Sequence, residues 1–137
     1  SLYTNTILMN LRDTERMEVA KYVISKMWKC EAYEFTQMKK RNKNIVNARR
    51  FFIYYLWKYL GVSHLKMKNY IHGVNHATSI YHCRKLEQEV DLYKEIRKKF
   101  ITFFYYADNR EYIKMKIDIK FPLEVMEDLE LKSNYLY

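Results

Sequence analysis

A chain of 137 residues is long enough for one domain with a real core and too short for two ordinary ones. Its composition, 49% hydrophobic and 17% aromatic with only two Gly and one Pro, excludes a disordered basic tail and disfavours a many-stranded sheet. The net charge of +9 favours a polyanionic partner.

The positive charge is confined to one block of the sequence. Between Phe35 and Leu86 there is no Asp or Glu, whereas eleven Lys and Arg lie there. The rest of the chain holds the other 14 basic residues and all 16 acidic residues, so it is slightly acidic. Such segregation is typical of a nucleic-acid-binding surface.

Three helices are predicted in the first half of the chain. Asp13 begins the first, which runs to about Glu31 with apolar residues at three- and four-residue spacing. A short helix over 33–39 follows, and the polar connector 40–44 is expected to be solvated or to lie on DNA. The third helix, 45–60, is apolar on most sides, which predicts a central buried helix.

Both glycines separate predicted helices in the second half. Gly61 follows the third helix, and Gly73 divides a helix over 65–72 from one over 75–90. A sixth helix covers 91–107. We therefore expect a mainly α fold, a bundle of about six helices that contains a helix-turn-helix.

In the C-terminal segment the apolar residues recur with a different spacing. Apolar and polar residues alternate over 112–121, which predicts a strand, and 123–131 reads as a short acidic helix. The strand needs a partner, either an extended segment within 2–10 or the same strand of a second copy. The predicted domains are thus a helical one, 12–107, and a terminal one, 108–137.

The stretch from Ser63 to Glu87 resembles the C-terminal duplex-DNA-binding domain, domain IV, of the bacterial replication initiator DnaA. The likeness is carried by Gly73, His76 and Thr78 in a Gly-x-x-His-x-Thr pattern and by the Arg-Lys pair that follows it. Residues 47–55 are similar to that family's Ala-Arg-Gln-x-Ala-Met-Tyr-Leu segment. No Gly-x-x-x-x-Gly-Lys-Ser/Thr loop occurs, so the resemblance is to a stand-alone domain without the ATPase module.

The resemblance implies DNA contacts for particular residues. It places an arginine in the minor groove and the start of the recognition helix against base edges in the major groove. The predicted base-contacting residues are Asn75, His76, Ala77, Thr78 and Arg49.

Other residues of the basic block, nearly all of them Lys or Arg, are expected to contact phosphates, because such contacts supply most of the affinity for DNA. The predicted phosphate-contacting residues are Lys39, Lys40, Arg41, Lys43, Arg50, Ser63, Lys66, Lys68 and Arg84.

Several residues depart from the DnaA pattern. Val74, Asn75 and Ala77 replace that family's Arg, Asp and Ser or Thr, so the target sequence is not carried over. Asn pairs with adenine, and Val or Ala contacts a thymine methyl, which favours A·T-rich DNA. Ser79 and His82 stand where the family packs Val and a small residue, which indicates an altered inner face of the helix.

The sequence offers no pattern for catalysis or for a metal. It has no paired carboxylates and no nucleophile motif, and its four histidines, His64, His72, His76 and His82, lack nearby carboxylates in sequence. We expect no enzymatic activity, no metal, no cofactor and no bound nucleotide.

The expected location is the cytoplasm of a bacterium or of a phage-infected cell. Cys30 and Cys83 lack the spacing of a disulfide framework or a zinc site, and no leader or membrane-spanning run is evident. A soluble protein in a reduced compartment, without a membrane partner, is the simpler prediction.

Two main functions remain open on the sequence alone, beside a third, a protein-binding mimic that engages the replication machinery. The first is a non-enzymatic double-stranded DNA-binding protein for replication initiation or control, or for transcription regulation, encoded by a phage or mobile element. The alternative is a structural or assembly protein, a packaging adaptor or virion component, that binds nucleic acid non-specifically as an oligomer and self-associates through the terminal strand.

Overall fold

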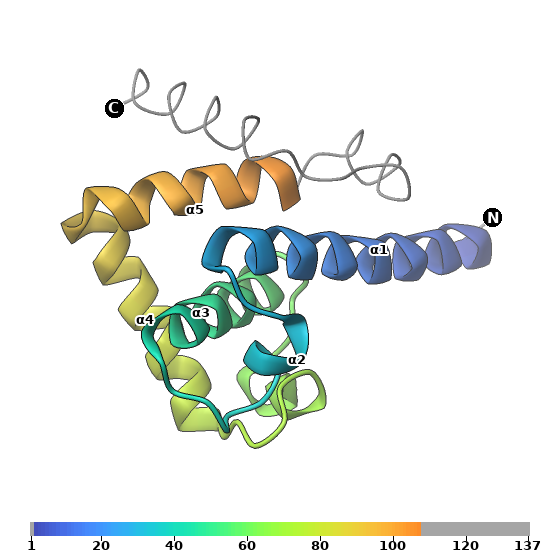
Figure 1. The fold of residues 1–137 in the computed structure, drawn as a ribbon. Helices are drawn as coiled ribbons and strands as arrows, with labels where there is room; N and C mark the ends of the chain where they lie inside the picture. Colours follow the sequence, from blue (N-terminus) through green and yellow to red (C-terminus); the bar gives the residue numbers. More distant parts are fainter. Residues whose placement is uncertain (1, 108–137) are drawn as a thin grey trace.

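The computed structural model describes residues 2–107, in which helices are joined by loops and turns (Figure 1). No strand is present within these residues, where the only pairing of β type is an isolated bridge. The expected mainly helical bundle is confirmed. Its elements are α1 (Leu2–Trp28), α2 (Ala32–Phe35), α3 (Lys43–Lys58), the 3-10 helix η1 (His64–Asn69), α4 (His76–Leu92) and α5 (Lys94–Ala107).

The central helix is α3, as its sequence predicts. Most of its residues are buried, because it is apolar on most sides and packs against α1, α4, α2 and η1. The ring of Phe51 lies 5.3 Å from that of Trp28 in α1 and 5.7 Å from that of Phe103 in α5. Figure 1 shows α1 and α5 side by side above α3, and α4 extending at an angle from the beginning of α5 down past α3.

The predicted helix-turn-helix is formed by η1, the turn that contains Gly73, and α4. Ser63 and Asn75 are the N-cap residues of η1 and α4, and their side chains accept hydrogen bonds from the amides of Lys66 (3.3 Å) and Thr78 (2.7 Å). Gly73 has φ of +85°, a conformation that glycine adopts without strain. The first helix of the motif is a 3-10 helix of six residues rather than an α-helix over 65–72.

The N-terminal boundaries differ from the predictions. The first helix begins at Leu2, not at Asp13, so the segment 2–10 is helical rather than an extended partner for a strand. The helix expected over 33–39 is a single turn, and a loop follows it. The predicted strand 112–121, the acidic helix 123–131 and the terminal domain 108–137 lie outside the described residues.

Candidate nucleic-acid interface

The loop between α2 and α3, residues 36–42 and here called the basic loop, lies against the turn of the helix-turn-helix. The amide of His72 donates to the carbonyl of Thr36 (2.8 Å), and the amide of Met38 donates to the carbonyl of His72 (3.0 Å). These bonds make a parallel bridge between Gln37 and His72. The loop and the turn are distant in sequence, but the fold makes them one surface (Figure 1).

Arg49, expected in the minor groove, is instead enclosed behind the basic loop. Its side chain is only 2% exposed, and its Nη2 donates to the carbonyls of Gln37 (2.5 Å), Lys40 (2.8 Å) and Glu34 (3.5 Å). Burial lowers the pKa of this guanidinium, and nearby Arg41 lowers it further. The placement does not fit the predicted minor-groove contact, because the guanidinium lies behind the basic loop and is not exposed to a ligand.

Arg50, expected to contact phosphate, is also buried. It forms an ion pair with Glu89 of α4, and its Nε donates to Nδ1 of His82 (3.2 Å). The guanidinium lies 5.9 Å from the ring centroid of Tyr81. Arg50 therefore joins α3 to α4, and its assignment to a phosphate is corrected.

The two unusual residues on the inner face of α4 both have partners. Burial, together with the positive charge of Arg50, lowers the pKa of His82 to about 4, so the ring is neutral at pH 7 and accepts the bond from Arg50. Ser79 is fully buried, and its hydroxyl lies 2.8 Å from Nδ1 of His64. These polar contacts fill the places where an apolar helix face was expected.

The N-terminus of α4 presents most of the predicted base-contacting residues. Asn75, His76 and Ala77 are exposed and Thr78 is half-buried. The Oδ1 atom of Asn75 is already used in the cap, which leaves its amide group as a donor. Val74 is only 6% exposed and belongs to the core. This position does not fit the thymine contact predicted for it.

The other predicted phosphate-contacting residues are exposed. They are Lys39, Lys40, Arg41, Lys43, Ser63, Lys66, Lys68 and Arg84.

One of these lysines has an acidic partner. Nζ of Lys40 lies 2.9 Å from Oε2 of Glu34. This hydrogen bond raises the pKa of Lys40 and lowers that of Glu34. The acid-free block of the sequence is therefore not acid-free in space, because α2 supplies a carboxylate beside it.

Two aromatic residues of this surface were not predicted from the sequence. Tyr81 is 54% exposed on α4, and its position four residues after Ala77 could have placed it on the same helix face. His64 stacks on Trp57 (5.2 Å between ring centroids), and its ring centroid lies 6.1 Å from that of His76. No local pattern signals the second arrangement, because the stacking depends on how η1 packs on α3.

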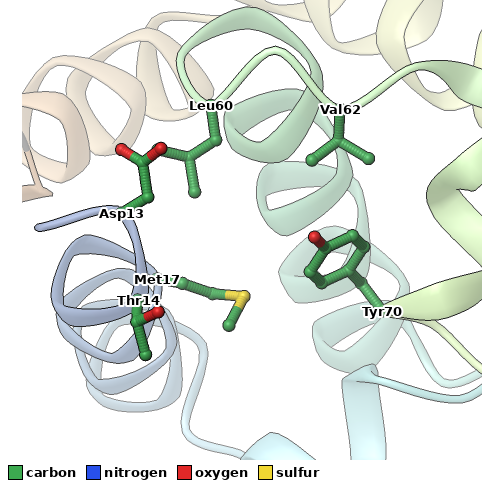
Figure 2. A pocket seen from close by; sticks show the side chains of 6 residues that line it. All are labelled: Asp13, Thr14, Met17, Leu60, Val62 and Tyr70. Atoms are coloured by element: carbon green, nitrogen blue, oxygen red, sulfur yellow. The ribbon is translucent and has the colours of Figure 1, made fainter. Parts of the chain in front are cut away.

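A hollow of about 290 Å³ lies between α1 and the segment that joins α3 to η1 (Figure 2). Its lining combines apolar side chains with one carboxylate and hydroxyl groups. This lining has no imidazole, thiol or second carboxylate to form a catalytic pair. The lining residues are Asp13, Thr14, Met17, Leu60, Val62 and Tyr70.

Comparison of the chain with protein-family models, with curated proteins and with solved structures gave no match. Within residues 2–107, no helix combines the length and apolarity needed to cross a membrane. The same residues hold no group of three or more His, Cys, Asp or Glu side chains placed to bind a metal ion. What the findings define is a helical protein with an exposed basic surface at a helix-turn-helix.

Proposed function

We propose that this chain is a non-enzymatic duplex-DNA-binding protein that inserts the N-terminus of α4 into the major groove. The observation that carries the proposal is the bridge between the basic loop and the turn at His72. Through it, cations from two segments distant in sequence come to lie beside the start of one exposed helix.

The chemistry of this surface suits a phosphate backbone next to base edges. Exposed Lys and Arg side chains neutralise phosphates, and the amide groups at the N-terminus of α4 favour an anion. Asn75, His76, Ala77 and Thr78 then lie where a recognition helix presents its first turn to bases. The resemblance to DnaA domain IV supports the same orientation.

The proposed role is replication initiation or control, or transcription regulation, in a bacterium, a phage or a mobile element. The proposed DNA contacts differ in one respect from those that the resemblance implies, because the buried Arg49 and Arg50 are not assigned as direct contacts. Phosphate contacts are therefore assigned to the basic loop and to η1 through Lys39, Arg41, Lys66 and Lys68.

The test is selection of bound duplexes from a randomised pool, followed by titration of the selected duplex and a scrambled control over a range of salt concentrations. We expect an enriched motif and a log–log salt slope of about −0.9 for each phosphate contacted. Equal affinity for both duplexes would favour the structural or assembly role. Absence of binding to any duplex would refute the proposal.

Substitution of His76 tests the placement of α4. His76→Ala should weaken binding to the selected duplex by roughly tenfold, while binding to the scrambled duplex changes little. Gln88→Ala, an exposed position farther along α4, is the matched control and should change neither affinity. Loss of discrimination in the control rather than in His76→Ala would place a different part of α4 on the bases.

A further inference from the structure

We propose that Arg49 and Arg50, consecutive residues of α3, are positioning residues that hold the basic loop and the recognition helix in register for DNA. The inference rests on the proposed function, and it names residues of the binding machinery that do not contact the ligand. Arg49 holds the loop, and Arg50 holds α4.

The loop depends on Arg49 because the guanidinium links carbonyls of the segment from Glu34 to Lys40 at one point. Among the described residues Arg49 has no acidic partner within ion-pair distance. A buried cation without a carboxylate is costly unless polar groups solvate it. The carbonyls of the loop provide that solvation, so the loop conformation and the burial of Arg49 stabilise each other.

The recognition helix depends on Arg50 in the same way. Arg50 reaches Glu89 and His82, which lie two turns apart on α4. Two attachment points along one helix restrain its rotation as well as its distance from α3. The side chain of Arg50 is thus suited to hold the exposed face of α4 at a fixed angle.

Both attachments start from one place in the fold. Successive side chains of an α-helix point about 100° apart, so neighbouring arginines of α3 reach two different elements. The rigid backbone of the buried helix α3 then sets the distance between the basic loop and α4. A duplex that must meet both elements at once is sensitive to this distance.

The first experiment measures amide hydrogen exchange in the free protein. All three carbonyls accept from Nη2 of Arg49. Arg49→Lys keeps the charge, but the lysine side chain is one atom shorter, so its ammonium does not reach the position of Nη2 among the three carbonyls. We expect the amides of Met38 and His72 to lose protection by roughly tenfold or more, while the amides within α3 stay protected. Unchanged protection at Met38 and His72 would overturn the role of Arg49.

The matched control is Lys58→Met, which removes one positive charge from an exposed position at the end of the same helix. It should leave the exchange of Met38 and His72 unchanged. Uniform loss of protection in Arg49→Lys, in α3 as well as in the loop, would indicate a general loss of stability and would also contradict a positioning role.

The second experiment measures binding of the Arg49→Lys variant to the selected duplex over a range of salt concentrations. Disorder of the loop should reduce the salt slope by about 0.9 for each phosphate that the loop no longer binds, although net charge is unchanged. A slope equal to that of the unmodified chain would overturn the inference. Failure of the unmodified chain to bind any duplex is a different result, because it refutes the proposed function and leaves the exchange experiment valid.

The third experiment uses a substitution for which long-range attraction and the release of Arg50 predict opposite changes in affinity. Glu89→Gln makes the protein more positive, so long-range attraction alone predicts tighter binding to all duplexes. Release of Arg50 predicts instead that affinity for the selected duplex falls by roughly tenfold, while binding to the scrambled duplex is retained or strengthened. Tighter binding to both duplexes would overturn the role of Arg50.

Discussion

At the scale of single residues, the protein buries polar groups where its helices meet. Arg50, His82 and Glu89 form one connected group between α3 and α4. Such a group is stable only while each member keeps its protonation state, because an unpaired buried charge is costly. The ring of His82 enters this group in its neutral form, because burial lowers its pKa.

The pKa of His82 predicts how stability depends on pH. In the folded chain this pKa is about 4, below the ordinary value of 6.5, because burial and then the charges of Arg50 and Arg49 disfavour the imidazolium. Between these values the unfolded chain binds more protons, so the contribution is fully present above about pH 6.5 and falls as pH drops toward 4. The expected decrease in stability is at most about 3 kcal/mol.

Urea unfolding at pH 7 and pH 4.5 measures this effect. His82→Gln should flatten the difference between the two pH values, while His72→Gln, an exposed histidine, should preserve it. The comparison between variants matters because carboxylates also titrate in this range. An equal pH dependence in both variants would assign the effect to other groups.

At the scale of elements, the ends of the helices are specified by caps and glycines. Helix α4 has a capping bond from the Thr78 amide to Asn75, whereas Asn42 at the start of α3 makes no such bond. The two helices also differ in burial, since α3 is surrounded and α4 exposes one face. A local cap is therefore more important for α4.

Asn75→Ala should lower the free energy of unfolding by about 1 kcal/mol, since it leaves a backbone amide without its acceptor. Asn42→Ala provides a control of the same chemistry at an N-cap without the bond, and its effect should be smaller. Chemical denaturation with helical circular dichroism measures both. Equal losses of stability would mean that the capping bond is not the source of the effect.

At the scale of the whole molecule, an aromatic core joins helices from both ends of the described chain. Phe51 of α3 lies in edge contact with Trp28 of α1 and with Phe100 and Phe103 of α5. Burial of large rings lets a small helical domain gain enough apolar contact to fold. The α4–η1 surface is supported on this core through α3.

Phe51→Ala should destabilise the protein by about 3–5 kcal/mol, because it reduces apolar burial and leaves a cavity. This is a large part of the total of about 5–15 kcal/mol that is typical of a domain. Tyr33→Ala removes a ring that is 63% exposed and should change stability by less than about 0.5 kcal/mol. Thermal and urea unfolding distinguish the two. A small effect of Phe51→Ala would place the stabilising core elsewhere.

Local sequence patterns were sufficient to predict the helical fold class, the central position of α3 and the helix junctions at Gly61 and Gly73. These features depend on apolar periodicity, caps and backbone freedom, which act over a few residues. The confinement of positive charge to one block is also a property of the sequence. The proposed target, double-stranded DNA, follows from that charge and from the helix-turn-helix pattern, and it stays a prediction.

Tertiary contacts decided which residues of the basic block remain available. Arg49, Arg50 and Val74 resemble surface contacts when they are aligned with a DNA-binding pattern, yet all three are buried. A cation in a helix is exposed or enclosed according to what packs on that helix, and here Glu89 and the carbonyls of the basic loop come from distant segments. The bridge between the loop and the turn is likewise a long-range contact, with no local pattern to predict it. Only the packed structure shows that two of the chain's arginines act on its own backbone and helices while neighbouring lysines face outward.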